Sequence, residues 1–230
     1  MGQGLEVRLR NRLALAALVL ALLAGCGNDT GATNPVVSMA GQLAKAGLAK
    51  AKGETAVAKA AAAPVSREDL AAYGKPILRV RSVQLGQDGF LTIADAKDEV
   101  VTWTAQGQAT FSLRDGVLIQ TRGLGADLMS AEAPSLAELQ SGASYQRVYF
   151  FLGEDDRGTR RTYDCLASTV GRTSVQILGK PHSVIHVSER CTRPNSKVTN
   201  DFWIEGNAIR SSRQWASSRV GYVEFERVID

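Results

Sequence analysis

Short runs of residues that alternate between apolar and polar side chains fill most of this 230-residue chain after about residue 66. Ile77–Val83, for example, sets Leu78 and Val80 against Arg79 and Arg81. A repeat of two residues is the pattern of a β-strand with one buried face. The same pattern recurs in Val117–Arg122, in Tyr145–Leu152, where Val148, Phe150 and Leu152 share a face, and in Tyr222–Ile229. The chain is therefore predicted to fold mainly as β-sheet.

Turn sequences separate these runs. They are rich in Gly, Asp and Asn, which accept the left-handed backbone of hairpin turns, and they comprise Gly86–Gly89, Gln106–Gly107, Asp115–Gly116, Asp155–Gly158, Gly179–Pro181 and Glu205–Asn207. Such spacing predicts an antiparallel meander of about nine or ten strands. Because closure removes exposed strand edges, we expect a single barrel-like domain over residues 66–230.

Two short helices are predicted within this domain. Ser66-Arg67-Glu68-Asp69 resembles a capping box ahead of a helix through Ala72. The stretch Ala126–Gln140 lacks the two-residue alternation, and Pro134–Leu139 within it predicts a helix inserted between strands.

Residues 1–25 are predicted to be a signal peptide. Three arginines precede the apolar run Leu13–Leu23, which is too short to span a bilayer, since a spanning helix needs roughly 20 residues. The run ends in Leu23-Ala24-Gly25-Cys26, which resembles a bacterial lipobox. The resemblance implies that Cys26 becomes the first mature residue and carries diacylglycerol and palmitate, and several acyl chains anchor a protein permanently. A buried structural thiol is the alternative for Cys26.

The residues after Cys26 predict an anchored tether over residues 26–65. Gly27 replaces the aspartate that usually signals retention in the inner membrane, so we expect sorting to the outer membrane. Residues 27–64 contain no aromatic residue, and glycines interrupt the Ala- and Lys-rich stretch Gln42–Ala63, which predicts at most a transient helix. The stretch either lies on anionic headgroups or is a solvated spacer.

Cys165 and Cys191 form an even pair in a chain predicted to reach an oxidising compartment, and we expect them to be bonded. The alternatives are two free thiols, or a metal site with His182 and His186, which share a face if residues 182–188 form a strand. Zinc needs three or four convergent ligands. We expect neither a metal nor a cofactor beyond the lipid on Cys26.

Net charge and motifs argue against two classes of function. The formal charge of +4 falls to +2 without the signal peptide, since 24 basic and 22 acidic residues remain, and no nucleic-acid partner is expected. The sequence has no nucleophile elbow and no phosphate loop. Glu154, Asp155 and Asp156 are predicted to lie in a solvated acidic turn, whereas a glycosidase needs two rigidly placed carboxylates. We therefore expect no enzyme activity.

Two blocks carry a family resemblance. The first runs from Val101 through the strand of Trp103 and the hairpin Arg114–Val117 to Thr121-Arg-Gly-Leu-Gly-Ala-Asp127-Leu128, and the second from Asn200-Asp-Phe-Trp203 to Arg210-Ser-Ser-Arg-Gln214. They resemble the tryptophan strand, the "T-x-G-L-x-x-D-L" run, the "N-x-Y/F-W" strand and the "R-S-x-Q" strand of the YjbF/GfcB lipoproteins of exopolysaccharide and group 4 capsule operons. Here Ile209 stands where many relatives have an aromatic residue.

The resemblance implies a mainly β, barrel-like fold and a non-catalytic role in assembly or export of an extracellular or capsular polysaccharide. The domain is then expected at the outer membrane, facing the periplasm. Expected partners are export proteins, an outer-membrane barrel or an acidic polysaccharide. Two alternatives remain: a periplasmic enzyme that modifies polysaccharide, and a structural assembly factor for an outer-membrane barrel.

Aromatic rings and arginines are the chemistry with which such a protein contacts a glycan. Sugar faces stack on tryptophan, and arginine binds carboxylates through paired hydrogen bonds. The candidate glycan or partner surface comprises Trp103, Arg114, Arg122, Trp203, Arg210, Arg213, Gln214 and Trp215. The alternative is that these rings fill the barrel core while the arginines lie outside it.

Overall fold

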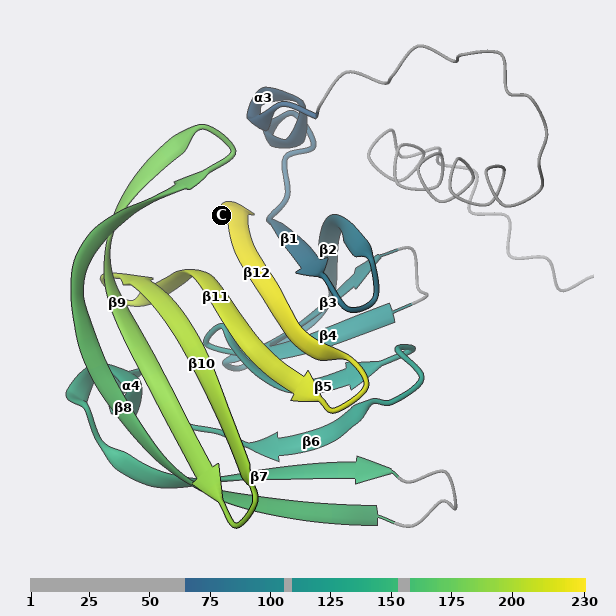
Figure 1. Cartoon of the computed structure of the whole chain (residues 1–230). Coiled ribbons are helices and arrows are strands. Elements are labelled where there is room, and N and C mark those ends of the chain that lie inside the picture. Colours follow the sequence, from purple (N-terminus) through teal and green to yellow (C-terminus); the bar gives the residue numbers. More distant parts are fainter. Residues whose placement is uncertain (1–64, 106–108, 153–157) are drawn as a thin grey trace, which may run out of the picture. The chain divides into compact units, whose positions relative to one another are not determined.

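The computed structural model describes residues 65–105, 109–152 and 158–230 (Figure 1). Cys26 and the proposed signal peptide and tether, apart from Val65, lie outside these residues. The described elements are α3 (Arg67–Ala71), β1 (Ile77–Ser82), β2 (Gln87–Lys97), β3 (Val100–Ala105), β4 (Ala109–Arg114), β5 (Val117–Arg122), β6 (Leu128–Glu132), α4 (Leu136–Ser141), β7 (Ser144–Leu152), β8 (Gly158–Ile177), β9 (Lys180–Arg193), β10 (Ser196–Glu205), β11 (Ala208–Ser217) and β12 (Gly221–Ile229).

All twelve strands belong to one antiparallel sheet in the order β5-β4-β3-β2-β1-β12-β11-β10-β9-β8-β7-β6. Most neighbours are joined by hairpins, as the turn sequences predict. There are two exceptions: α4 lies in the connection between β6 and β7, and the pair β1 and β12 joins the first and last described strands in the middle of the sheet. The two edge strands, β5 and β6, approach each other, so the sheet forms a nearly closed barrel (Figure 1). The predicted fold class is confirmed.

The number of strands differs from the prediction of about nine or ten. One of the twelve, β6, lies inside the stretch 126–140 that lacks alternation. Its side chains alternate between partly buried and exposed from Met129 to Glu132, and its register with β7 shifts between Leu128 and Ser130. The helix predicted in the same stretch is present as α4.

The largest core cluster lies between strands from both halves of the sheet. It includes Phe111 of β4, Tyr149 of β7, Tyr163 of β8, Trp215 of β11 and Phe225 of β12. The rings of Phe111 and Phe225 meet edge to face with centroids 5.5 Å apart. Trp215 packs edge to face on Tyr149 at 5.1 Å, a favoured aromatic geometry.

In β7, the residues that face this core are those on the side opposite the predicted apolar residues Val148 and Phe150. Val148 is buried and Phe150 partly buried on one face, as the alternation predicts. The other face carries Arg147 and Tyr149, which are fully buried, and Phe151, which packs against the core cluster. The apolar pattern therefore misidentifies the more deeply buried face, because an arginine with a buried partner substitutes there for an apolar residue.

Both helices begin with the reciprocal hydrogen bonds of a capping box. In α3, Ser66 accepts from the Asp69 amide while the Asp69 carboxylate accepts from the Ser66 amide; Ser135 and Glu138 do the same in α4. Hydrogen bonds from the hydroxyl and amide of Ser66 hold the pKa of the Asp69 carboxyl below its usual range, and those from the amide and hydroxyl of Ser135 do the same for Glu138. The predicted capping box at Ser66 is thus confirmed.

The helices cover separate parts of the sheet. Leu70 of α3 packs with Ile77, Ile177 and Val228, so α3 joins the ends of β1 and β12 to the tip of the β8–β9 hairpin, which curls toward it (Figure 1). Leu139 of α4 belongs to a second cluster. Among the described residues, no helix has the length and apolar content needed to cross a membrane.

Candidate functional site

The eight residues proposed as a glycan or partner surface lie in three different environments. Trp103, Gln214 and Trp215 are in the interior, with exposures of 4%, 0% and 8%. Arg114 and Arg122 bind backbone carbonyls near the barrel edges. Trp203, Arg210 and Arg213 project from the strand face opposite the core residues Phe202, Ile204 and Gln214. The structure thus places Trp203, Arg210 and Arg213 on one face and separates them from the other five residues.

Gln214 closes the free edge of β5. Its side-chain oxygen accepts from the Leu118 amide at 2.8 Å, and its side-chain nitrogen donates to the Gly116 carbonyl at 2.8 Å. An unpaired strand edge is a row of exposed donors and acceptors, and here a side-chain amide stands in for the next strand. The interior position of the "R-S-x-Q" glutamine therefore favours a structural role.

Close approach of β5 to β11 makes this pairing possible. A Cβ atom on Gly116, whose φ is +87°, would lie 2.9 Å from the Ile209 side chain. With Asp115 at φ +49°, Gly116 forms the left-handed turn that the Asp-Gly pair predicts. Ile209, which departs from the aromatic residue of many relatives, thus packs directly against this turn.

The motif Thr121–Leu128 builds the corner between β5 and β6. The Asp127 carboxylate accepts hydrogen bonds from the Thr121 hydroxyl and from the amides of Gly123 and Leu124, at 2.9–3.2 Å. The Thr121 hydroxyl in turn accepts from the Leu128 amide at 2.9 Å. These contacts account for the threonine, the first glycine and the aspartate of the motif as one self-contained loop.

Arg122 crosses from β5 to β6. Its guanidinium donates to the carbonyls of Leu128 and Met129, each at 3.3 Å, and Gln120 donates to the Met129 carbonyl at 2.9 Å. Side chains thus connect the two edge strands. On the preceding strand, the Arg114 guanidinium donates to the Ala133 carbonyl.

A buried ion pair that the sequence analysis missed lies behind the β5 edge. Arg147 and Glu189 are both fully buried, with an N–O distance of 2.8 Å, and Arg147 also donates to the Leu118 carbonyl at 3.2 Å. Glu189 accepts further bonds from the Tyr145 hydroxyl at 2.9 Å and the Asn200 side-chain amide. No sequence signal marks these charges as buried, because each occupies an ordinary polar position in a strand.

The buried network extends to the aromatic core. Asn200 accepts from the Trp215 amide at 2.7 Å, and the Arg147 guanidinium lies 5.1 Å from the centroid of the Tyr149 ring. Burial raises the pKa of the Tyr149 hydroxyl to about 12. Burial and the neighbouring Glu189 carboxylate also raise the pKa of Tyr145. The asparagine of the "N-x-Y/F-W" motif therefore links the charged network to strand β11.

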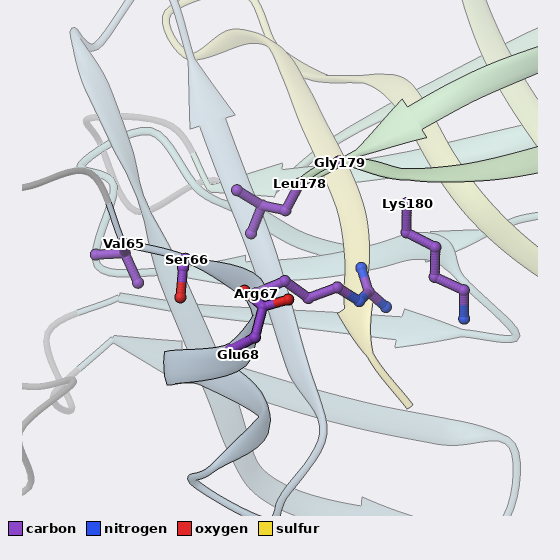
Figure 2. A pocket seen from close by; sticks show the side chains of 7 residues that line it. All are labelled: Val65, Ser66, Arg67, Glu68, Leu178, Gly179 and Lys180. Carbon is purple, nitrogen blue, oxygen red and sulfur yellow. The ribbon is translucent and has the colours of Figure 1, made fainter.

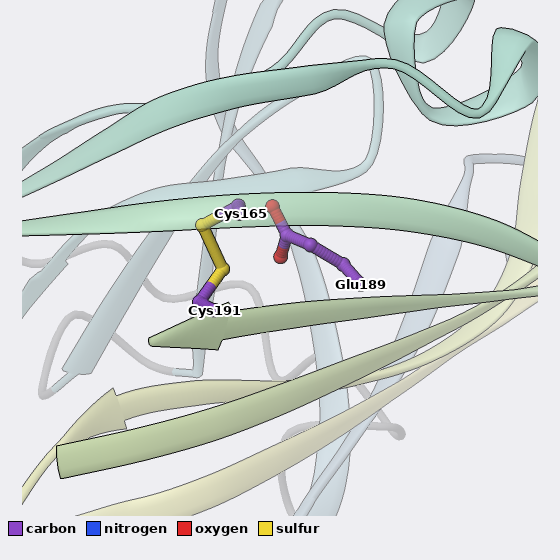
Figure 3. A group of neighbouring side chains, drawn as sticks. All are labelled: Cys165, Glu189 and Cys191. Atoms are coloured by element: carbon purple, nitrogen blue, oxygen red, sulfur yellow. A yellow bond between two sulfur atoms is a disulfide. The ribbon is translucent and has the colours of Figure 1, made fainter. Parts of the chain in front are cut away.

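Cys165 and Cys191 face each other directly in the β8–β9 ladder and form the predicted disulfide (Figure 3). Glu189 lies beside the bond, and among the described residues these three form a group with the ligand types of a metal site. Both thiols are consumed by the disulfide, and the carboxylate binds Arg147. Cys165, Cys191 and Glu189 are therefore arranged as a structural cross-link between strands and not as free metal ligands.

The face opposite the core on β9–β12, here called the outer face, gathers an aromatic and charged cluster. The His186 and Trp203 rings stack with centroids 4.9 Å apart and an interplanar angle of 10°, and the His186 Nε2 atom lies 2.9 Å from an Asp201 carboxylate oxygen. The Arg213 guanidinium lies 3.6 Å from the centroid of the Tyr222 ring. Half-buried rings and guanidinium groups here are held in defined orientations.

A second charged group on the outer face contains Arg210. Its guanidinium binds Glu205 at 2.7 Å and Asp230 at 2.7 Å, while the His182 ring binds the same Glu205 carboxylate at 3.1 Å. Hydrogen bonds from His182 and Arg210 hold the pKa of the Glu205 carboxyl below its usual range. The two histidines therefore share a face, as their spacing predicts, but each binds a different carboxylate.

Two hollows lie away from this cluster. A groove of about 630 Å³ separates Val65–Glu68 from Leu178–Lys180, where Arg67 and Lys180 project into the same region (Figure 2). Arg67 donates to the Ile177 carbonyl at 3.1 Å and thus joins α3 to the β8–β9 hairpin. A smaller cavity, of about 320 Å³, lies where the β5–β6 loop meets the β11–β12 turn.

Comparison with known proteins identifies a family and a similar fold. A family model described as "Group 4 capsule polysaccharide lipoprotein gfcB, YjbF" matches residues 51–228. The crystal structure of the hypothetical lipoprotein YmcC from Escherichia coli K12 superposes with a TM-score of 0.63 at 22% identity, over 72% of this chain and 89% of that chain. No curated protein matches the chain. The structural likeness shows a shared fold, and the family match covers all but the last two residues of the described part.

Proposed function

Since the chain belongs to the YjbF family of group 4 capsule polysaccharide lipoproteins, we propose that it is a non-catalytic, lipid-anchored protein that assists assembly or export of a capsular polysaccharide. The observation that carries this proposal is the family match over residues 51–228, which spans the whole barrel rather than one motif. Cys26 is the proposed lipid attachment site. The proposed location is the outer membrane, with the barrel in the periplasm.

The state of the carboxylates supports a non-catalytic role. Glycan hydrolysis needs two carboxyl groups on either side of a bond, one of them free to donate a proton. In the described strands, Glu189 is buried against Arg147, and Glu205 and Asp201 bind neighbouring side chains. Each of these acids stabilises the barrel or its surface, and none is paired with another across a cleft.

The outer face provides a surface for an export partner. Trp203 with His186 and Arg213 with Tyr222 present rings and guanidinium groups that are already ordered, which lowers the entropic cost of binding. Tryptophan, tyrosine and arginine are also the residues that dominate binding energy at protein interfaces. We propose this face as the contact with the export apparatus.

Deletion of the gene tests the role in export. We expect less surface polysaccharide, or polysaccharide of altered length, with unchanged cytoplasmic sugar-nucleotide pools, as measured by polymer extraction, size analysis and nucleotide chromatography. Restoration by the wild-type chain is the control. Unchanged amount, length and surface attachment of the polymer in the deletion strain would refute the proposal.

Membrane fractionation tests the anchor and its destination. Cys26→Ser should leave the chain unprocessed, because no thiol remains to accept diacylglycerol, while Gly27→Asp should retain a processed chain in the inner membrane. Gly27→Ala is the matched control and should fractionate as the wild type does. Normal processing of Cys26→Ser would contradict the lipobox.

A further inference from the structure

The β8–β9 hairpin extends beyond the strand that flanks it on the β8 side. Strand β7 pairs with β8 only as far as Leu166. The next amide, that of Ala167, donates to the Ala143 carbonyl at 3.1 Å. Among the described residues, no strand pairs with the following segment, Ser168–Ile177, on the side away from β9. The last part of β8 is therefore an unpaired sheet edge, on the arm that curls toward α3 (Figure 1).

A proline shows which backbone groups point outward from this edge. Pro181 of β9 has no N–H, and it lies opposite Gln176 of β8 in the ladder. Pairs with and without hydrogen bonds alternate along an antiparallel ladder, so Gln176 directs its N–H and C=O away from β9. The register is unshifted over Gly171–Ile177, and the backbone groups of Arg172 and Ser174 therefore point outward as well.

This edge lacks the features that protect most exposed strands. Proline, lysine and short length normally block an edge from pairing with another chain. The other edge of the arm carries Pro181, whereas Gly171–Ile177 contains neither proline nor lysine, and its charged residue is Arg172. Thr173 and Val175 are β-branched and favour an extended strand. The segment is thus suited to pair with a further strand.

Charge and length select the register in which a second copy of the same edge would pair. A register that sets Arg172 opposite Arg172 places like charges together and is destabilising. The regular segment lies between a bulge at Val170 and the turn that starts at Leu178, so pairing centred on Ser174 uses its full length. That register sets Arg172 opposite Gln176, both of which are exposed.

The other face of the same pairing is apolar. Thr173 of one copy lies opposite Val175 of the other, and β-branched residues that face each other stabilise a sheet. Val175 already packs against the cluster of Leu70, Ile177 and Val228. A second copy therefore extends an apolar cluster that the first copy has built.

We infer that two copies of the chain pair antiparallel along β8, with the two-fold axis at Ser174. The backbone groups of Arg172, Ser174 and Gln176 then form about six hydrogen bonds between the copies. A single pair of edges buries little surface, so we expect a weak dimer that depends on concentration. This inference goes beyond the proposed export role and does not depend on it.

Sedimentation equilibrium of the full chain tests the dimer, over a wide range of concentration in detergent with micelles in excess. Ser174→Pro should weaken the wild-type dimer about tenfold or more, because each copy loses an N–H that donates across the axis. Ser183→Pro is the matched control. Ser183 is exposed and lies opposite Ser174 in the ladder, so its N–H points toward the other edge of the arm, and this variant should dimerise as the wild type does. Circular dichroism of each variant confirms the fold.

Cysteine cross-linking tests the register. Ser174→Cys should form a disulfide-linked dimer under mild oxidation, because the Cα atoms of a hydrogen-bonded pair lie about 5.5 Å apart, within the reach of a disulfide. Ser183→Cys is the matched control, since it lies one strand further from the axis and should stay monomeric on a non-reducing gel.

Three results would overturn the inference: a chain that is monomeric at every concentration, a Ser174→Pro dimer as strong as the wild type, or equal cross-linking of Ser174→Cys and Ser183→Cys. Slow hydrogen exchange of the Ser174 amide in a monomer would also overturn it, in favour of a strand from residues 26–64 of the same chain. These outcomes leave the deletion experiment untouched. Conversely, an unchanged capsule after deletion would refute the export role whatever the oligomeric state.

Discussion

At the scale of single residues, the interior of this barrel depends on polar groups that satisfy one another. Removing two charges from water costs several kcal/mol per ion, and the attraction between them compensates only when the remaining hydrogen-bonding atoms also find partners. Glu189 meets this condition with Arg147, Tyr145 and Asn200, whereas the buried Arg147 Nε atom has no hydrogen-bond partner among the described residues. The network therefore specifies how β7, β9 and β10 pack more than it adds to stability.

Breaking one half of the pair should be strongly destabilising. Glu189→Gln leaves the Arg147 charge buried without its counterion, and we expect the free energy of unfolding to fall by about 3–5 kcal/mol in urea titrations. Arg79→Met is the control. It removes partly exposed ion pairs with Asp88 and Glu226 and should cost about 1 kcal/mol.

A double variant separates charge burial from packing. The double variant Arg147→Met with Glu189→Leu removes both charges. Its loss in the free energy of unfolding should be at least about 1 kcal/mol smaller than the sum of the losses in the single variants Arg147→Met and Glu189→Leu. Additive losses would mean that the two side chains act independently.

The alkaline limit of stability follows from the buried phenol of Tyr149. Its pKa is about 12 in the folded chain and 10 in the reference state, so above pH 10 the unfolded chain binds fewer protons than the folded one. The contribution of the protonated Tyr149 phenol to the free energy of unfolding is complete below pH 10 and is lost as the pH rises from 10 to 12. Thermal unfolding at pH 9–11.5 should show a fall in melting temperature that is smaller in Tyr149→Phe.

At the scale of elements, the disulfide joins strands that already pair. Cys165 and Cys191 are separated by 26 residues along the chain, and closing such a loop removes unfolded-state entropy worth about 3.5 kcal/mol in the chain-entropy model. The bond thus fixes the longest hairpin of the sheet, β8–β9, whose tip packs under α3.

Replacing both cysteines should lower stability without changing the fold. We expect Cys165→Ala with Cys191→Ala to lose about 3 kcal/mol, which corresponds to a melting temperature roughly 6–12 °C lower for a domain of this size. Reduction of the wild-type chain should reproduce the shift and leave the variant unchanged. A variant as stable as the oxidised wild type would show that the ladder alone fixes the hairpin.

The sequence predicts elements well where a local rule determines them. The capping box at Ser66 and the Asp115–Gly116 turn each depend on neighbours in sequence, and both form as expected. The buried face of β7 was missed because its environment comes from distant strands, whereas β6 was missed as a five-residue strand whose register with β7 shifts between Leu128 and Ser130. Arg147 can occupy a buried position only because Glu189, 42 residues away in the sequence, packs against it.

At the scale of the whole molecule, alternation and turns predicted the barrel but not how it is assembled. Local hairpins account for most neighbours, whereas the β1–β12 pair joins residues about 150 positions apart, such as Arg79 and Glu226, which also form an ion pair at 3.3 Å. The prediction of the candidate site was limited in the same way, because burial depends on contacts between distant strands. Tryptophan and arginine types suggested glycan contact, but burial separated Trp103 and Trp215 from Trp203.

Truncation tests the dependence on the last strand. A chain that ends at Arg219 lacks β12, and we expect it to lose protease resistance and cooperative unfolding, because β1 and β11 both lose their neighbour. A chain that lacks only Asp230 is the control and should lose only the surface ion pairs of Asp230 with Arg210 and Arg227. Cooperative unfolding of the longer truncation would mean that each half of the sheet folds by itself.

The central position of β12 sets the order of events during biogenesis. β1 precedes β12 along the chain, so in a chain that emerges N-terminus first the edge of β1 must wait without its partner until β12 has emerged. A waiting strand edge invites pairing with other chains. The strand order thus predicts that the emerging chain needs chaperone protection and that its yield is sensitive to lesions in β12.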